Sequence, residues 1–342
     1  MEYRQLGRTG VRVSELCLGT MSFGASADEK TAIAVVDSAI DAGINFIDTA
    51  DCYGEGVSEQ ILGKALQGSR KRDEIVLATK AVAAMGVGPN DRGASRFHLS
   101  RAVEDSLQRL QTDRIDLFYL HVVDITTPMD EIFGQLDILV NQGKILYVGT
   151  SKWPVPLIME GLMMHEKYGY PRIVAEQPPY NLCDRGIENE LVWTCIRHGI
   201  GLCTWGPLAS GLLGGAYRKG QPIPEGHRWS AADPETNKRF TLAALDVVEK
   251  LSVIAEARGV ALPDLCHAWL LQRPGITAPI IGARKPEYVT AAVRATEMRL
   301  TTEELAEIDR IIAPGSAVSD YYDGNTYARM RRAVNSDQPW SY

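Results

Sequence analysis

The order of apolar and amphipathic segments along the chain predicts a (β/α)8 barrel, the TIM barrel. Eight short apolar runs alternate with helical stretches, and strands that alternate with helices form a parallel sheet, which closes into a barrel when there are eight. The runs are mainly apolar, as strands buried on both faces are. The expected strands are Glu15–Leu18, Asn45–Asp48, Ile75–Thr79, Leu117–Leu120, Ile145–Ser151, Ala175–Gln177, Gly201–Trp205 and Ala278–Ile281.

Several of the intervening stretches have clear helical signals. Glu29–Ala42 and His98–Leu110 place apolar residues three and four positions apart, so each has one apolar face. Ala243–Arg258 ends before Gly259, and glycine is common just after a helix end. Thr302–Ile311 begins at a Thr-Thr-Glu-Glu capping pattern and stops shortly before a proline. These stretches are therefore expected to form helices.

An open, doubly wound sheet is the main alternative to the barrel. Such a sheet usually carries a GxGxxG fingerprint after its first strand when it binds a dinucleotide. The segment after the first expected strand, residues 19–24, reads GTMSFG, which does not fit, and the chain has no Walker A motif. The barrel is therefore preferred.

The chain of 342 residues is expected to form a single domain, because one barrel needs about 250 residues. The barrel core is assigned to about residues 11–312, and residues 313–342 form a C-terminal tail. Two other long irregular segments, Ala83–Phe97 and Tyr217–Phe240, follow the third and seventh expected strands. They should lie at the C-terminal mouth of the barrel, where loops of this length are usually lids or binding loops.

Composition argues for a cytoplasmic protein that binds neither nucleic acid nor membrane. The net charge is −7 and no basic stripe is present, whereas nucleic-acid binders usually show one. No stretch approaches the roughly 18 apolar residues that span a bilayer. The six cysteines form no CxxC pair, which favours reduced thiols and argues against a metal site.

Polar residues follow three successive expected strands at the ends that converge on the mouth. Asp48 ends the second strand and Tyr53 follows in the next loop, while Lys80 and His121 follow the third and fourth strands. Taken singly, each residue type is often a cap, a rim charge or a packing residue. Their coincidence at the end where barrel active sites are built indicates a catalytic site.

These four residue types suit the reduction of a carbonyl by hydride transfer. The developing alkoxide needs a proton, which the Tyr53 phenol can supply if its pKa falls toward the operating pH. The Lys80 ammonium would lower that pKa, and the Asp48 carboxylate would hold the ammonium in place. A neutral His121 would orient the carbonyl oxygen. This chemistry requires no metal, and no metal-ligand spacing is present.

The same segments resemble the signature of the aldo-keto reductase superfamily. The resemblance is carried by residues 46–54 (FIDTADCYG), by the Ser-Glu and Leu-Gly pairs that follow, and by the contexts of Lys80 and His121. It extends from about Tyr3 to Ile312, and the segment after His121 looks like the bacterial branch of sugar-ketone and broad-range aldehyde reductases. The resemblance implies that Asp48, Tyr53, Lys80 and His121 are the catalytic tetrad. It also implies NADPH or NADP⁺ as the cofactor and a small-molecule carbonyl compound as the substrate.

The resemblance also assigns residues to the cofactor. It implies that Ser151 and Gln177 bind the nicotinamide carboxamide, and that Trp205 replaces a tyrosine that stacks on the nicotinamide ring, a role that another flat ring can keep. The residues assigned in this way are Gly19, Thr20, Met21, Asp48, Ser151, Lys152, Gln177, Trp205, Gly206, Leu208, Ser210, Gly211, Ile281, Gly282, Arg284 and Tyr288.

The chain departs from the family pattern in two places, after the fifth expected strand, where Lys152 could reach a phosphate or point outward, and near the eighth expected strand. Lys152 stands where the family commonly has asparagine, and Tyr288 and Ala292 stand where arginine or glutamine and asparagine are common. Arg284 then becomes the expected partner of a 2′-phosphate, because a guanidinium matches phosphate geometry. NADPH is therefore preferred to NADH.

Three alternatives to the reductase stay open at this stage. The same residues can run the reaction backwards as an alcohol dehydrogenase. The family resemblance extends to potassium-channel β-subunits, so the chain could be a cofactor-binding regulatory subunit. Some barrels are isomerases or aldolases, in which a lysine such as Lys80 forms a Schiff base. The oligomeric state is also open, a homo-oligomer included.

Overall fold

The computed structural model of the protein describes all residues except 68–70, 222, 224, 226–227, 231 and 323–342. Eight parallel strands form one sheet in the order β10-β3-β4-β5-β6-β7-β8-β9, which confirms the predicted (β/α)8 barrel. Each expected strand overlaps an observed one. The strands are β3 (Cys17–Gly19), β4 (Phe46–Asp48), β5 (Val76–Ala81), β6 (Ile115–Leu120), β7 (Ile145–Thr150), β8 (Ile173–Glu176), β9 (Gly201–Leu202) and β10 (Ile280–Gly282).

Hydrogen bonds between the first and last strands of this order close the sheet. Just beyond β9, the Thr204 amide donates to the Ala278 carbonyl oxygen over 3.1 Å, and the Ile280 amide of β10 donates to the Thr204 carbonyl oxygen over 2.7 Å. Because all neighbouring pairs in the sheet are parallel, their carboxyl ends share one end of the barrel. This end is the mouth that carries the candidate site.

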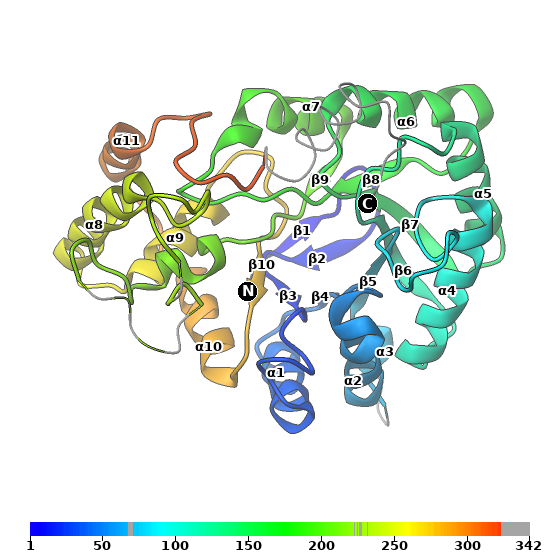
Figure 1. Ribbon diagram of the computed structural model, residues 1–342, viewed down its shortest axis with the longest axis horizontal. Coiled ribbons are helices and arrows are strands. Elements are labelled where there is room, and N and C mark those ends of the chain that lie inside the picture. The colour runs from blue at the N-terminus through cyan, green and yellow to red at the C-terminus, as the bar shows by residue number, and fades with distance from the viewer. Residues whose placement is uncertain (68–70, 222, 224, 226–227, 231, 323–342) are drawn as a thin grey trace.

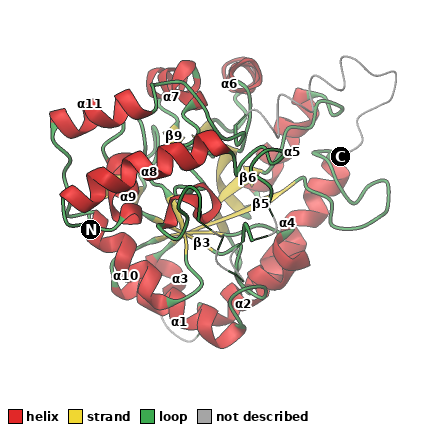
Figure 2. Cartoon of the chain, turned by 60° about the vertical axis from the view of Figure 1, so that its left-hand side comes forward, coloured by secondary structure: helices red, strands yellow, loops and turns green. Residues whose placement is uncertain are grey.

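Helices surround the strands, as Figures 1 and 2 show. The four helices expected from periodicity are present, and the capping box of the last one forms between Thr301 and Glu304. The helices are α1 (Glu29–Asp41), α2 (Val57–Ala65), α3 (Lys71–Glu74), α4 (Arg96–Leu110), α5 (Met129–Asn141), α6 (Val155–Tyr168), α7 (Leu191–His198), α8 (Leu242–Ala257), α9 (Leu262–Leu271), α10 (Pro286–Ala295) and α11 (Thr302–Ile311). Three short 3-10 helices are η1 (Tyr53–Gly56), η2 (Gly186–Asn189) and η3 (Ala209–Gly214). None of the helices in the described part is long and apolar enough to cross a membrane.

An N-terminal hairpin covers the end of the barrel opposite the mouth. Its strands β1 (Tyr3–Gln5) and β2 (Arg12–Ser14) pair antiparallel and were not expected from the sequence. Leu6 and Val13 of the hairpin are buried and pack with residues inside the barrel such as Phe46. The two strands read Tyr-Arg-Gln and Arg-Val-Ser, so no apolar run marks them in the sequence.

Small residues leave room for aromatic rings inside the barrel. A Cβ atom at Gly149 of β7 would lie 2.5 Å from two ring carbons of Tyr119, which projects inward from β6. The Tyr119 ring in turn lies under the mouth, 6.0 Å from the Nζ atom of Lys80. The interior is therefore filled by side chains up to the level of the candidate site.

We expect Gly149→Ala to lower the free energy of unfolding by about 1–3 kcal/mol, because the added methyl group forces Tyr119 or the backbone to move. Urea denaturation would measure the change. Gly10→Ala is the matched control, since a Cβ atom there meets no atom within 4 Å. Equal stabilities of the two variants would contradict this account of the barrel interior.

Candidate active site

A buried ion pair joins two strands at the mouth of the barrel. Asp48 is the last residue of β4, and Lys80 lies on the neighbouring β5 with a side chain that is 0% exposed. Lys80 Nζ donates to Asp48 Oδ1 and, over 2.7 Å, to the Thr49 carbonyl oxygen. Gln177, just beyond β8, donates from Nε2 to Asp48 Oδ2 over 2.8 Å. The pair is thus hydrogen-bonded to residues from two sides of the barrel.

Tyr53 lies beside this pair at the start of η1. Its hydroxyl oxygen is 3.4 Å from Lys80 Nζ, and the centroid of its ring is 5.0 Å from the same atom. The turn that brings Tyr53 back to the barrel uses left-handed backbone at Gly54 (φ 58°) and Gly56 (φ 95°). Glycine adopts this conformation at little cost, which explains the two glycines here.

His121 completes the group directly after β6. Its amide donates to the Ala81 carbonyl oxygen over 2.9 Å, which continues the pairing of β6 with β5. Its ring packs edge-on against Tyr53, with centroids 5.7 Å apart and planes at 81°. The structure therefore brings the four residues of the expected tetrad together.

The pKa of Tyr53 is raised, whereas the expected mechanism called for a lowered pKa. Burial raises the pKa of Tyr53 and outweighs Lys80, which acts in the expected downward direction. For Lys80, burial alone would lower the pKa, but Asp48 and Tyr53 reverse this and raise it above its usual value. At neutral pH the phenol therefore keeps its proton and the lysine stays an ammonium ion.

Two buried polar side chains fix the segment that carries Tyr53. Ser58 Oγ lies 2.8 Å from Thr20 Oγ1 and 3.0 Å from Thr49 Oγ1. Glu59 is 0% exposed and accepts from Thr79 Oγ1 over 2.5 Å and from Arg109 Nε over 2.7 Å. These contacts tie the start of α2 to β5, to α4 and to the residues that follow β3 and β4, so the loop before α2 has a fixed position.

Comparison with known proteins agrees with this geometry. The model of the Aldo/keto reductase family matches residues 15–313, which is most of the chain. The chain belongs to this family. It is therefore an oxidoreductase of the aldo/keto reductase type, built on the expected barrel.

Three relatives of this aldo/keto reductase illustrate the range of the family. The uncharacterized oxidoreductase YrpG of Bacillus subtilis (strain 168) is 40% identical over 94% of this chain and 99% of its own length. A probable voltage-gated potassium channel subunit beta of Oryza sativa subsp. japonica is 35% identical over 91% of this chain and 97% of its own. L-glyceraldehyde 3-phosphate reductase of Escherichia coli O157:H7 is 34% identical over 92% of this chain and 93% of its own.

The residues expected at the nicotinamide lie around the ion pair of this aldo/keto reductase. Ser151 is buried and donates from Oγ to the Gln177 carbonyl oxygen over 2.9 Å. Thr20 is buried and donates to the Asp48 carbonyl oxygen over 3.1 Å, whereas Met21 is 56% exposed. Gly19 fits closely between strands, since a Cβ atom there would lie 2.7 Å from the Ile280 side chain. Thr20 and Gly19 thus have structural roles in addition to any contact with a cofactor.

Trp205 lies beyond β9 and is half-buried. The C-terminal segment packs against its ring. The Tyr321 ring meets it edge-on at 6.0 Å, and the Arg239 guanidinium lies 4.5 Å from the centroid of Tyr321. Asp184 holds this segment by accepting the Tyr321 amide over 2.8 Å and the Tyr322 amide over 2.7 Å. Residues 313–322 of the expected tail therefore return to the barrel, whereas 323–342 lie outside the described residues.

The loop after Trp205 has the backbone of an anion cradle. Left-handed φ angles occur at Gly206 (68°), Ala209 (49°), Ser210 (55°) and Gly211 (92°), and Leu208 lies between them. Turns of this kind can point amide N–H groups into a concavity that suits phosphate, although the amides of Ala209 and Gly211 donate within the loop to the carbonyl oxygens of Gly206 and Leu208. A Cβ atom on either glycine would meet no atom within 4 Å, so there is open space beside the loop. These residues fit the pyrophosphate of a dinucleotide.

The residues expected at the adenosine end lie on the surface near β10. Ile281 is buried, while Gly282 and Arg284 are exposed. The Arg284 guanidinium lies 5.9 Å from the centroid of Tyr288, which is 44% exposed. Lys152 is half-buried beyond β7 and adopts a left-handed φ of 59°. The Arg284 side chain is therefore accessible to a phosphate group.

Two residues at the mouth were not assigned a role from the sequence. Cys52 Sγ lies 3.5 Å from His121 Nδ1, although 69 positions separate the two residues. Asp51 is 0% exposed, and burial together with Glu59 raises its pKa to about 7. Burial likewise raises the pKa of Cys52 to about 11. Only the fold brings Cys52 and His121 together, so spacing along the chain gave no signal.

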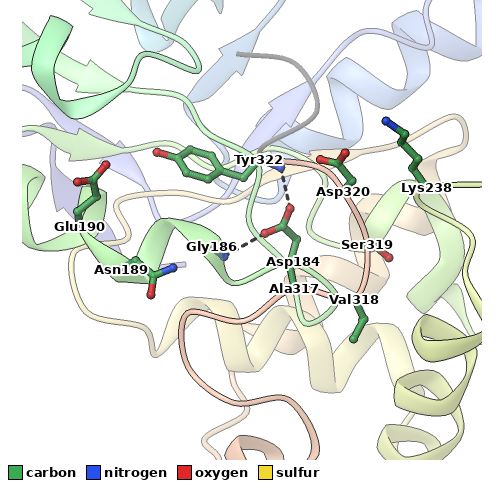
Figure 3. A pocket seen from close by; sticks show the side chains of 10 residues that line it. All are labelled: Asp184, Gly186, Asn189, Glu190, Lys238, Ala317, Val318, Ser319, Asp320 and Tyr322. Atoms are coloured by element: carbon green, nitrogen blue, oxygen red, sulfur yellow. Dashed lines mark hydrogen bonds between the residues drawn. The ribbon is translucent and has the colours of Figure 1, made fainter. Parts of the chain in front are cut away.

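A separate pocket lies beside the C-terminal segment, and Figure 3 shows its lining. Asp184 lies among the lining side chains and accepts the Gly186 amide over 3.0 Å in addition to the amides of the C-terminal segment. The other lining residues include Lys238, Asp320 and Tyr322, and none belongs to the tetrad. Two of the Asp184 hydrogen bonds hold the C-terminal segment at Tyr321 and Tyr322, and the third holds the turn at Gly186.

Glu176 of β8 is a buried carboxyl group beside the end of β7. It accepts the hydroxyl of Thr150 and, over 3.2 Å, the amide of Trp153, and so fixes the turn at residues 151–152. Burial raises its pKa from 4.5 to about 8. A raised carboxyl pKa means that the folded state keeps a proton that the unfolded state releases between these pH values, so stability falls as the pH rises through this range.

We therefore expect Glu176→Gln to remove part of the pH dependence of stability. Between pH 5 and pH 9 the wild type should lose about 2–5 kcal/mol more free energy of unfolding than the variant. Urea denaturation at several pH values would measure this difference. The exposed Glu307→Gln is the matched control and should follow the wild type. Parallel curves for Glu176→Gln and the wild type would contradict a buried, protonated Glu176.

Proposed function

We propose that this protein is a cytoplasmic, NADPH-dependent reductase of aldehydes and ketones in which Tyr53 donates the proton. The observation that carries the proposal is the position of Lys80 Nζ, which is bonded to Asp48 and lies 3.4 Å from the Tyr53 hydroxyl. The free state of all six cysteines agrees with a reducing compartment.

When bound, the nicotinamide supplies the hydride. Tyr53 donates its proton to the carbonyl oxygen, and the neighbouring Lys80 ammonium stabilises the phenolate that remains. Asp48 keeps the ammonium charged and in place, since the two groups are hydrogen-bonded and buried. His121 lies edge-on to Tyr53 and would donate an N–H to the same carbonyl oxygen. The raised pKa keeps the proton on Tyr53 in the free protein, so the Lys80 ammonium has to stabilise the phenolate as the proton leaves.

The residues present fit NADPH along the whole mouth. Gln177 and Ser151 would hold the carboxamide, and the half-buried Trp205 would stack on the nicotinamide ring. The left-handed loop at 206–211 would bind the pyrophosphate through its amides. Arg284 is exposed and would bind the 2′-phosphate, which is the group that distinguishes NADPH from NADH.

The substrate class is proposed as small aldehydes, keto-sugars or polycyclic ketones. The name of the Escherichia coli relative, L-glyceraldehyde 3-phosphate reductase, adds a phosphorylated three-carbon aldehyde to this set. A Schiff-base mechanism is disfavoured by the ion pair, because a nucleophilic lysine must lose its proton and the pKa of Lys80 is raised.

A regulatory role is the second candidate, since two plant relatives are named as probable potassium channel β-subunits. A protein of that kind would bind the cofactor tightly without turnover of any carbonyl substrate. The complete tetrad favours the enzyme. Turnover with a panel of carbonyl substrates, followed by a cofactor titration on the same sample, separates the two functions.

We expect Tyr53→Phe to lower turnover with NADPH by roughly 10²–10⁴-fold, because the variant lacks the proton donor but keeps the ring. Loss of NADPH absorbance with aldehydes, quinones, keto-sugars and L-glyceraldehyde 3-phosphate would measure it. Tyr168→Phe removes a hydroxyl from an exposed tyrosine on α6 and should leave turnover unchanged. Equal turnover by Tyr53→Phe and the wild type would exclude Tyr53 as the donor.

We expect Arg284→Ala to raise the KM for NADPH roughly tenfold or more while the KM for NADH changes little, because a charge-assisted contact to the 2′-phosphate is lost. Steady-state kinetics with both cofactors would measure the change in each KM. Lys285→Ala removes an adjacent exposed charge and should have a small effect on both constants. Similar losses in the two variants would indicate general surface charge rather than a specific phosphate contact.

A further inference from the structure

Three potential metal ligands lie together at the mouth of the barrel. Asp51 and Cys52 precede Tyr53, and His121 follows β6. One ligand atom from each of the three residues lies within 4.8 Å of the other two. Cys52 Sγ and His121 Nδ1 are 3.5 Å apart.

This separation matches the geometry of a tetrahedral zinc site. With a Zn–S bond of about 2.3 Å and a Zn–N bond of about 2.0–2.1 Å, the tetrahedral angle places the sulfur and nitrogen ligands about 3.6 Å apart. Cys52 and His121 already have this spacing. An Asp51 oxygen at the outer limit of the cluster would need to move inward by about 1 Å, which a side-chain torsion can supply.

The Asp51 carboxylate supplies an independent reason to expect a cation. Its side chain is 0% exposed, and neither oxygen accepts a hydrogen bond of normal geometry from the described residues, although the amide of Cys52 faces it. A buried carboxylate without a partner is costly, and such groups are usually paired or bound to a metal. A thiol–imidazole hydrogen bond would explain Cys52 and His121 but would leave Asp51 without a partner.

We propose that Asp51, Cys52 and His121 form a binding site for a thiophilic divalent cation, for which Zn²⁺ is the best match. Thiolate, imidazole and carboxylate are the ligands that zinc prefers, and three protein ligands leave a fourth position for water. The cation replaces the thiol proton of Cys52, which passes to solvent. The thiolate and the carboxylate together balance the charge of the metal.

A cation bound at this site would inhibit turnover by the enzyme. Coordination takes Nδ1 of His121 as a ligand and holds the ring, which packs against Tyr53, so the ring can no longer turn to orient a carbonyl oxygen. Inhibition rests on the proposed function, because it requires His121 to act on the substrate. Metal binding does not rest on it, so the two can be tested apart.

Binding would be tested by titrating the reduced full chain with Co²⁺ as a spectroscopic substitute for Zn²⁺. We expect the wild type to develop a thiolate-to-cobalt charge-transfer band and the visible bands of four-coordinate cobalt, with one equivalent bound and reversal by Zn²⁺. Cys52→Ser should lose the charge-transfer band, and Asp51→Asn should weaken binding at least about tenfold. Cys195→Ser and His198→Gln on α7 are matched controls that should bind as the wild type does.

Thermal unfolding of each variant would establish that it is folded. The proposal is overturned if the folded wild type shows no charge-transfer band, or if Cys52→Ser keeps it. In parallel, Zn²⁺ should inhibit NADPH turnover by the wild type, and Cys52→Ser should need at least about tenfold more Zn²⁺ for the same inhibition. Cobalt binding without any carbonyl turnover would support the metal site and count against the proposed reductase.

Discussion

The buried ion pair of Lys80 and Asp48 is the interaction on which the site depends. Both side chains are almost fully removed from water, and a buried charge is tolerated only when it is paired and hydrogen-bonded. The carbonyl oxygen of Thr49 and the amide of Gln177 complete the pairing from two sides of the barrel. The charge therefore fixes the ends of β4, β5 and β8 relative to one another, and it places an ammonium ion beside Tyr53.

The barrel and the tetrad could be predicted from the sequence because both produce regular patterns of residue types along the chain. Eight apolar runs alternate with helical stretches, and a polar residue follows each of three successive strands. The N-terminal hairpin has no such pattern, since its two strands are mainly polar and form no apolar run. The hairpin is held by buried contacts such as those of Leu6. These contacts form only with the interior of the closed barrel.

The pKa of Tyr53 and the contact between Cys52 and His121 could not be predicted from the sequence. The direction of the Tyr53 pKa follows from a balance between burial and Lys80, and burial has the larger effect. The pairing of Cys52 with His121 crosses from the loop after β4 to the end of β6. Such contacts result from the closure of the barrel. Neither the residue types nor their spacing along the chain predicts them.

The fastening of the C-terminal segment by Asp184 has a consequence for how the protein is made. Tyr321 forms the wall behind Trp205, so this side of the mouth stays incomplete until residue 321 has left the ribosome. All eight strands can pair before that point, since β10 ends at Gly282. A nascent chain can therefore pair its barrel strands before the wall behind Trp205 is in place.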